Sequence, residues 1–310
     1  MTYTEFINET DAKLAGLYGP EERRAMAARL LQHFCGISRY EHIIEPFGTI
    51  APEKIPVLQR STNELAMARP LQYILGFSEF AGNLFHVEEG VLIPRSETEE
   101  LVRWILSELK TNRDIYGTEC TILDAACGSG CIGVSLASSL AGSKLYMCDI
   151  SEKALEVTRL NSNNILKRDS ECTIFKYDLL GQHPITDIIP EGSLDVLVSN
   201  PPYVRDSEKE QMHRNVLEYE PSIALFVPDE DPLKFYRAIA LIGMKTLKAS
   251  GMLFFEINEA FGKDVLEMLE SLGYSETELR RDLNGRERMV KASFSQCRES
   301  LQDGQSHAGI

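Results

Sequence analysis

The sequence predicts an α/β protein with a mostly parallel sheet, a C-terminal antiparallel hairpin and a small helical domain at the N-terminus. Three observations predict this fold class. Short segments that are apolar throughout alternate with amphipathic helical patterns, as in a parallel sheet covered on both faces. An Asn-Gly pair separates the last two alternating segments, which is typical of a hairpin. The first ~80 residues contain mainly helical patterns.

The first domain is expected to cover residues 1–80. Helical spacing of apolar residues predicts four helices, which cover 3–17 and 23–34 and begin after Pro52 and at Ser61. Glu64 would complete a capping box with Ser61. The stretch 71–93 is rich in aromatic residues, Ile, Val and Gly, and suits a short hairpin or two extended segments. The domain boundary is therefore placed near Gly82.

The second domain is expected to cover residues 81–295, followed by a disordered tail at 296–310. Its first helix starts at Ser96, with Glu99 completing a second capping box. The apolar segments predict strands at 121–124, 144–150, 172–178, 194–200 and 251–258, and the gaps predict helices at 131–140, 151–166, 232–247 and 260–272. Segments 274–282 and 286–294 would form the hairpin, with Asn284-Gly285 as a two-residue type I′ turn.

Composition excludes several classes of function. The chain has 310 residues and a net charge of -15, from 32 Lys and Arg against 47 Asp and Glu, which argues against tight binding to nucleic acid. No apolar segment reaches the ~20 residues of a membrane span, and the acidic N-terminus does not resemble a signal peptide. Seven cysteines without a CxxC pair indicate reduced thiols in a cytoplasmic protein and no metal site.

The first candidate site is a glycine-containing turn between the strand at 121–124 and the next helix. Gly128 and Gly130 would let a ligand approach the backbone, and Asp149, at the end of the following strand, could accept both ribose hydroxyls. A dinucleotide would need a third glycine, and Asp124 would repel a phosphate. These features favour S-adenosylmethionine (SAM), although a strand–helix turn also needs small residues for purely structural reasons.

The second candidate site is Asn200-Pro201-Pro202-Tyr203, at the carboxyl end of the fourth predicted parallel strand. An amide or aromatic amine is a poor nucleophile because its lone pair is delocalised. The Asn200 side-chain oxygen and the Pro201 carbonyl could each accept one N–H and hold such a nitrogen in line for attack. Tyr203 offers a flat face, and the Pro-Pro step stiffens the loop. The alternative is a proline-rich turn without function.

Four segments resemble one known family: 69–76, 92–99, 200–203 with Glu220-Pro221, and 281–288. Through them the chain resembles class I SAM-dependent methyltransferases, and more closely the protein-(glutamine-N5) methyltransferases that modify peptide chain release factors. The resemblance covers about Arg69 to Arg288. Asn-Pro-Pro-Tyr is shared with adenine-N6 methyltransferases, whereas segments 69–76 and 92–99 are more specific to the glutamine enzymes.

The resemblance implies a Rossmann-like methyltransferase domain that transfers a methyl group from SAM, releasing S-adenosylhomocysteine. Its acceptor would be the glutamine of the Gly-Gly-Gln motif in class I release factors. The cofactor-binding residues it implies are Asp124, Ala126, Cys127, Gly128, Ser129, Gly130, Asp149, Asp178, Leu179 and Asn200. Within this set, 126–130 would contact the methionine end, Asp149 the ribose, and Asp178 with Leu179 the adenine. Asn200, Pro201, Pro202 and Tyr203 would bind the substrate amide, and Asn200, Pro201 and Tyr203 would be catalytic.

One departure from the family pattern concerns the turn. Ala126-Cys127 stands where the family usually has Gly-Thr, so Ala126 must adopt a backbone angle that alanine permits. Cys127 is interpreted as a small packing residue. Pro94, Arg95, Thr98 and Glu99 resemble part of the rim over the cofactor pocket, without an assigned role.

Two other functions stay open from the sequence. An adenine-N6 methyltransferase for DNA or RNA would share the loop at 200–203 but would need a basic surface. A non-catalytic adaptor with a SAM fold would not need Asn200 and Tyr203 intact. For the favoured function we expect a monomer without membrane or strong nucleic-acid binding, in which the helical domain helps to recognise the release factor.

Overall fold

The computed structural model describes residues 1–111, 119–167 and 170–294, so the tail predicted to be disordered lies outside the described residues. The described chain separates into two compact units. The first combines Met1–Phe77, Val87–Glu89 and Met212–Glu220, and the second combines Ser78–His86, Gly90–Gln211 and the chain from Pro221 onward. Within the described ranges, no helix has the length and apolar character needed to cross a bilayer.

The first unit consists mainly of helices, as predicted for the N-terminal region, but it also includes α10 (Arg214–Tyr219) from much later in the chain, which was not predicted. The helices are α1 (Tyr3–Lys13), α2 (Pro20–Cys35), α3 (Glu41–Ile44), the 3-10 helix η1 (Pro52–Lys54), α4 (Ile55–Ala66), α5 (Leu71–Leu75) and α10. Thr2 and Glu5 form a capping box at the start of α1, and Gly36 ends α2 in the left-handed conformation. Apolar faces of α1, α2 and α4 pack together around Phe6, Leu30 and Leu58.

Two predictions for this region are wrong in detail. Ser61 lies inside α4, because the helix already begins at Ile55 with a proline in its first turn, and the capping box with Glu64 is not formed. The start of the stretch predicted to be extended is helix α5, which ends at Gly76 in the left-handed conformation. The expected strands follow as β1 (Phe77–Phe80) and β2 (Asn83–His86), which pair with each other.

The second unit is built on a seven-stranded sheet with the order β10-β11-β9-β6-β3-β4-β5. Its strands are β3 (Thr121–Ala125), β4 (Lys144–Asp149), β5 (Glu171–Lys176), β6 (Leu194–Ser199), β9 (Leu247–Glu256), β10 (Glu276–Arg281) and β11 (Glu287–Ser293). The first five are parallel and the last two antiparallel, as predicted. The chain order reverses at β3, whose neighbours are β4 and β6.

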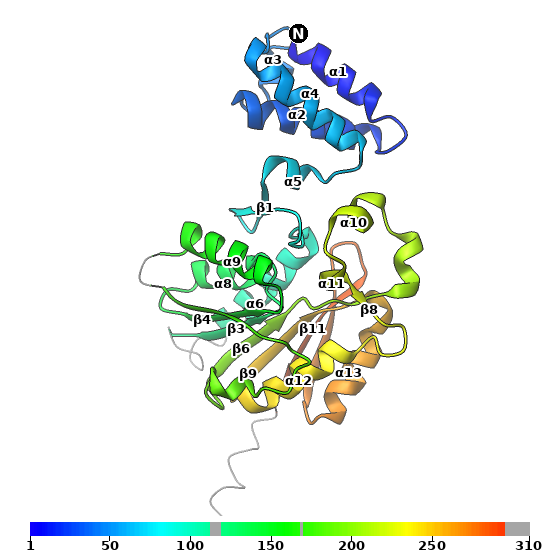
Figure 1. The fold of residues 1–310 in the computed structure, drawn as a ribbon. Helices are drawn as coiled ribbons and strands as arrows, with labels where there is room; N and C mark the ends of the chain where they lie inside the picture. Colours follow the sequence, from blue (N-terminus) through cyan, green and yellow to red (C-terminus); the bar gives the residue numbers. More distant parts are fainter. Residues whose placement is uncertain (112–118, 168–169, 295–310) are drawn as a thin grey trace, which may run out of the picture. The chain divides into compact units, whose positions relative to one another are not determined.

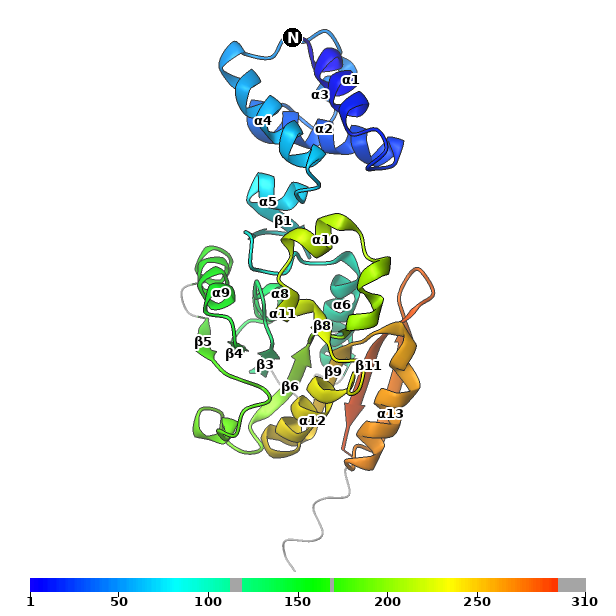
Figure 2. The ribbon, with the colours of Figure 1, turned by 45° about the vertical axis from the view of Figure 1, so that its right-hand side comes forward.

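Helices cover both faces of this sheet (Figures 1 and 2). One face carries α6 (Ser96–Thr111), α8 (Cys131–Ser139) and α9 (Glu152–Ile165), and the other carries α12 (Lys234–Thr246) and α13 (Gly262–Ser271). Successive strand residues point to opposite faces, so Ile122 joins the first core and Leu123 the second. Trp104, the single tryptophan of the chain, packs edge-on against Phe254 in the first core.

Short elements complete the second unit. They are η2 (Ile185–Asp187), β7 (Val204–Arg205), η3 (Asp206–Gln211), α11 (Ser222–Leu225), β8 (Phe226–Val227) and η4 (Glu259–Phe261).

At the start of α6 the predicted capping box is wrong. Ser96 is already helical and donates to the Glu97 carboxylate, while the Glu99 side chain accepts from the Ala81 N–H.

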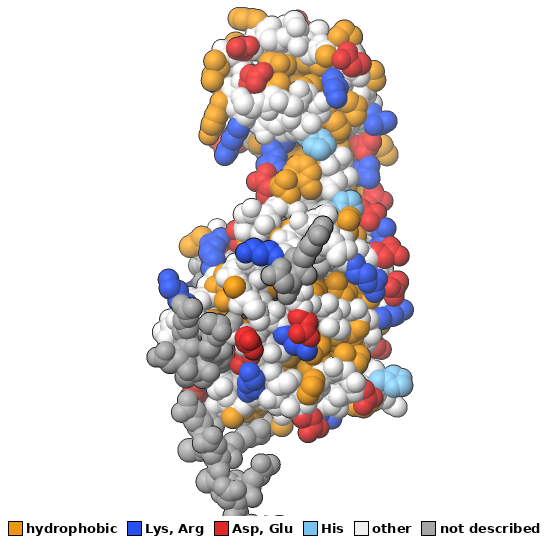
Figure 3. All heavy atoms as spheres, turned by 90° about the vertical axis from the view of Figure 1, so that its left-hand side faces the viewer, with side chains coloured by type: hydrophobic (Ala, Val, Ile, Leu, Met, Phe, Trp, Pro, Cys, Tyr) orange, Lys and Arg blue, Asp and Glu red, His pale blue; other side chains and the backbone are white. Residues whose placement is uncertain are grey.

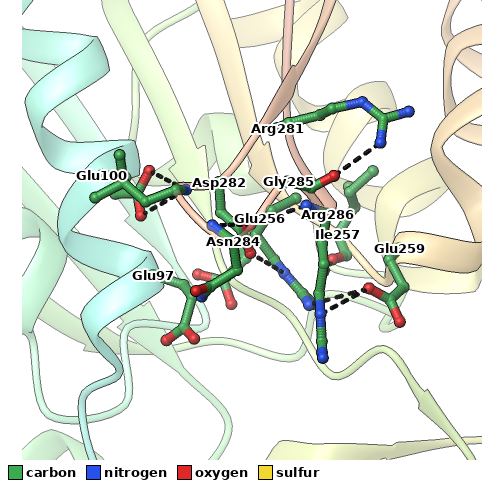
Figure 4. Close-up of polar contacts among 12 residues, drawn as sticks. Glu97, Glu100, Glu256, Ile257, Glu259, Arg281, Asp282, Asn284, Gly285 and Arg286 are labelled. Carbon is green, nitrogen blue, oxygen red and sulfur yellow. Dashed lines mark hydrogen bonds and ion pairs between the residues drawn. The ribbon is translucent and has the colours of Figure 1, made fainter.

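The C-terminal hairpin forms as predicted, but its turn is different. The Asp282 N–H donates to the Arg286 carbonyl, so the loop contains three residues, 283–285, and only Gly285 among them has a positive φ, of 81°. This arrangement is a turn followed by a left-handed residue, not type I′. The Asp282 side chain accepts the N–H groups of Asn284 and Arg286, which stabilises the longer loop (Figure 4).

Candidate functional site

Most site residues predicted from the sequence lie at or just after the carboxyl ends of neighbouring parallel strands. Ala125 at the end of β3 lies opposite Cys148 of β4 on one side and Ser199 of β6 on the other. The next residues along these strands are Ala126, Asp149 and Asn200. Ligands of open α/β sheets bind at this edge, where the strand order reverses.

The turn after β3 has an unusual backbone. Ala126, Gly128 and Gly130 have φ angles of 59°, 56° and 77°. All three lie in the left-handed region, which glycine adopts freely and alanine does not. Ala126 therefore has a conformation that suits glycine better than alanine, which strains the backbone.

Three side chains hold this turn in place. Asp149 accepts the Gly128 N–H at 2.9 Å, Thr158 donates to the Gly128 carbonyl at 2.9 Å, and Asn161 donates to the Ser129 carbonyl at 2.9 Å. Thr158 and Asn161 lie three residues apart and share one face of α9. Sequence reasoning missed both, although a polar pair inside the apolar stripe of a helix was a visible signal.

Asp124 lies fully buried at the end of β3. Its Oδ2 accepts the Gly133 N–H at 2.8 Å, whereas Oδ1 has no hydrogen-bond partner among the described residues. Burial raises the pKa of Asp124 to about 7, against the opposing effect of the Gly133 hydrogen bond. Burial also raises the pKa of Asp149, which the backbone N–H groups of Ser151 and Gly128 partly offset.

Cys127 has the environment of a packing residue. Its side chain is buried, its Sγ lies 3.5 Å from the Thr158 hydroxyl, and its N–H donates to the Cys148 carbonyl. Burial, with Asp149 nearby, raises the pKa of the thiol well above its ordinary value. The reactive thiolate is therefore disfavoured, in agreement with the sequence interpretation.

A recess opens in front of the turn and brings several predicted residues together. Its volume is about 360 Å³, including the part that is open to solvent. Its walls come from the turn, the start of α8, the loop before α6 and the end of β6, with the lining residues Leu92, Ile93, Pro94, Arg95, Thr98, Ala126, Cys127, Gly128, Ser129, Cys131, Ile132 and Asn200. The structure thus places Asn200 on the same recess as the glycine-containing turn.

The loop after β6 is joined to the rest of the site by polar contacts. Asn200 Nδ2 donates to Thr98 Oγ1 at 3.3 Å, and the Tyr203 hydroxyl donates to Glu256 Oε1 at 2.9 Å. Pro201 and Pro202 are buried between them. Sequence reasoning did not single out Glu256, although a carboxylate at the end of an otherwise apolar strand was a signal.

The residues predicted to contact adenine do not line this recess. Asp178 is exposed, and its Oδ1 accepts the Leu180 N–H in a local turn after β5. Leu179 borders a different hollow, formed with α12 and the segment 180–185. The structure therefore groups 126–129 with Asn200, and leaves Asp178 and Leu179 on a separate part of the strand edge.

The residues of the recess fit the methionine end of SAM. A Cβ placed on Gly128 would meet no atom within 4 Å, so the backbone of the turn is open to a ligand. Behind the turn lies the unpartnered Asp124 oxygen, and Asp149 adds a second carboxylate beside it. A negative charge on Asp149, which accepts the Gly128 N–H, would suit a sulfonium cation and oppose a phosphate.

Comparisons with known proteins agree with a methyltransferase fold. The family described as methyltransferase small domain matches residues 97–219. A protein named release factor glutamine methyltransferase from Flavobacterium psychrophilum is 38% identical over 293 residues, 94% of this chain and 97% of that protein. One of the same name from Bacteroides thetaiotaomicron is 39% identical over 290 residues, 94% of this chain and 98% of that protein.

Among solved structures, the catalytic domain of hMettl16 in complex with the MAT2A 3′UTR hairpin 6 is similar in fold. The TM-score is 0.50 at 16% identity, over 77% of this chain and 82% of that one. At this identity the similarity concerns the fold alone. With the strand order and the helical N-terminal region, it confirms the predicted class I methyltransferase fold.

Proposed function

The chain belongs to the release factor glutamine methyltransferase family, and from this premise we propose that it methylates a glutamine side chain of a peptide chain release factor, with SAM as the methyl donor. One observation carries the proposal. Asn200, whose side chain can hold an amide, lies on the same recess as the turn that fits the cofactor. Methyl donor and acceptor nitrogen would therefore meet in one place, and well-oriented reactants gain on the order of 7–11 kcal/mol.

SAM supplies an electrophilic methyl group on a sulfonium sulfur. The turn at 126–130 binds its amino-acid end and Asp149 its ribose, while Asp178 and Leu179 are proposed for the adenine. Asn200 Oδ1 and the Pro201 carbonyl accept the two N–H groups of the glutamine, and Tyr203 supports the planar amide. The nitrogen becomes acidic once it is alkylated, so its proton leaves to water without a strong base on the chain.

Mass spectrometry of a purified release factor, incubated with the chain and SAM, tests the proposal. We expect a gain of one methyl group on the glutamine of the Gly-Gly-Gln motif. Asn200→Ala should lower turnover on the order of 100-fold or more, the size seen when one preorganised hydrogen-bond partner is removed from an active site. The SAM affinity of this variant, measured by calorimetry, should change much less.

Asn163→Ala serves as the matched control, because Asn163 is exposed on α9. Turnover of Asn200→Ala close to that of the control would refute the role of Asn200. SAM binding without any transfer by the unmodified chain would instead support a non-catalytic adaptor. Methylation of DNA or RNA adenine, with binding that persists at physiological salt, would support the adenine-N6 alternative.

The surface charge favours the protein substrate. The net charge is -15, and on the face shown in Figure 3 the described Lys and Arg side chains are interspersed with Asp and Glu. Such a surface does not attract a phosphate backbone. This charge supports the proposal that the enzyme does not bind nucleic acid tightly. We further propose that it is a cytoplasmic monomer and that residues 1–80 help to recognise the release factor.

A further inference from the structure

Two side chains of the loop at 200–203 form a continuous hydrogen-bonded network with two buried side chains from other elements. Asn200 Nδ2 donates to Thr98 Oγ1 at 3.3 Å, Thr98 Oγ1 donates to Glu256 Oε2 at 2.6 Å, and the Tyr203 hydroxyl donates to Glu256 Oε1 at 2.9 Å. Glu256 is 1% exposed and Thr98 is 2% exposed. The network joins the start of α6, the end of β9 and the loop after β6, which are far apart in the sequence.

The Glu256 carboxylate determines the direction of these hydrogen bonds. Both of its oxygens accept a hydroxyl proton, Oε2 from Thr98 and Oε1 from Tyr203, as an ionised carboxylate does. The distance of 2.6 Å from Thr98 is typical of a hydroxyl that donates to a charged oxygen. Burial raises the pKa of Glu256, and the positive charge of Arg288 and the two hydroxyl donors oppose that effect.

The hydrogen bond that Thr98 donates to Glu256 in turn orients the Asn200 amide. Because the Thr98 proton is used on Glu256, Oγ1 can only accept from Asn200, which must present its NH₂ group. Oδ1, at the other end of the amide, is then the atom left to accept an N–H from a substrate. The same carboxylate holds the Tyr203 hydroxyl, while the Tyr203 carbonyl accepts from Asn258 at 3.2 Å.

We propose that Thr98 and Glu256 are positioning residues that hold the Asn200 side chain with its oxygen toward the substrate amide and hold Tyr203 beside it. The inference rests on the proposed function, because it assigns Asn200 Oδ1 the task of binding the glutamine N–H. It gives a role to Thr98, one of the rim residues of segment 92–99, and adds Glu256 to the site.

Glu256→Gln is the informative variant, because it changes hydrogen-bond direction with little change in shape. The new amide can donate to Thr98 Oγ1, which frees the Thr98 proton for Asn200. Asn200 would then present its oxygen to Thr98 and its NH₂ group to the substrate, two donors facing each other. Thr98→Val removes the hydroxyl and keeps the shape, and Thr98→Ser keeps the hydroxyl.

The experiment measures kcat and KM of each full-length variant with intact release factor, together with SAM affinity by calorimetry. Glu256→Gln and Thr98→Val should lower kcat roughly 10- to 100-fold, as misplacement of a reacting group does. Their affinity for SAM should stay within about threefold, since neither change alters the turn at 126–130. Thr98→Ser should keep most of the activity.

A second measurement follows the Asn200 side-chain amide by ¹⁵N NMR, with the signal assigned from its loss in Asn200→Ala. This signal should shift in Glu256→Gln and Thr98→Val and stay in place in Thr98→Ser, whatever substrate the enzyme uses. Unchanged signals in the first two variants overturn the inference even if the unmodified chain proves inactive.

The kinetic results separate the remaining outcomes. Absence of transfer by the unmodified chain counts against the proposed function only. Wild-type kcat in Glu256→Gln, or equal losses in Thr98→Ser and Thr98→Val, contradicts the positioning roles. Parallel losses of SAM affinity and stability in every variant would show a purely structural role and also contradict the inference.

Discussion

Ala126→Gly should stabilise the second unit, which contains the methyltransferase sheet, although it removes a side chain from the turn at 126–130. Ala126 has a φ of 59°, in the left-handed region. This conformation costs an L-residue with a Cβ atom roughly 1–2 kcal/mol, and glycine avoids that cost. Glycine also gives the unfolded chain more freedom, which offsets roughly 0.4–1 kcal/mol of the gain.

The difference between these terms predicts a net gain of about 0.8 kcal/mol in the free energy of unfolding. For a domain of this size, such a gain raises the unfolding midpoint by roughly 2–3 °C. Trp104 makes the measurement specific, because this single tryptophan is 3% exposed in the core of the methyltransferase unit. Its fluorescence followed during heating without SAM reports the unfolding of that unit alone.

Gly128→Ala, the reverse substitution at another residue with a positive φ, provides the control. Gly128 has a φ of 56°, and a Cβ placed there would meet no atom within 4 Å. The substitution therefore adds backbone strain without a clash, and we expect a loss of about the same size. An unchanged or lower midpoint for Ala126→Gly, or no loss for Gly128→Ala, would refute the argument from backbone strain.

Two further predictions concern pH and substrate recognition. The raised pKa of Asp124, about 7 in the folded state against 3.8 unfolded, means that the folded protein binds the extra proton and loses stability as the pH rises through this window. The free energy of unfolding of Asp124→Asn, relative to that of wild type, should therefore increase by about 1–3 kcal/mol from pH 5 to pH 8. Urea titrations followed by Trp104 fluorescence measure this change, and a difference that does not vary with pH would contradict the raised pKa of Asp124. In the helical unit, Ile44 and Phe47 are 75% and 81% exposed. Replacing both with Ser should lower kcat/KM for intact release factor roughly 10-fold and leave a short glutamine peptide unaffected, whereas equal losses would argue against recognition by this patch.

Most of the second unit could be predicted from hydrophobic periodicity. Each apolar segment became a strand of the sheet, and each amphipathic segment between them became a helix, because burial on two faces leaves a clear pattern in the sequence. Short elements such as β7, α11 and β8 were not predicted, and the other errors lie at element ends, where a single hydrogen bond determines the cap or the turn. Asp282, for example, accepts two N–H groups of its own turn and so stabilises a three-residue loop over the expected Asn-Gly turn.

The candidate site could be predicted to the extent that it follows strand ends. Ala126, Asp149 and Asn200 occupy equivalent places at the ends of neighbouring strands, so chain order and the apolar segments were sufficient to predict that they lie together. The contact between Thr98 and Glu256 could not be found in this way, because the two residues are 158 positions apart and meet only in the folded structure. Periodicity describes which face a residue occupies, but it does not show which distant polar group it will bind.

The hydrogen bonds from α9 to the turn at 126–130 also restrict which substitutions the helix can accept. The carbonyls of Gly128 and Ser129 need donors, and Thr158 and Asn161 supply them from adjacent turns of the helix. Apolar replacements at these two positions would leave carbonyl oxygens unpaired next to the ligand. We therefore expect a library randomised over α9 to tolerate many changes on its outer surface, and to retain only hydrogen-bond donors at 158 and 161.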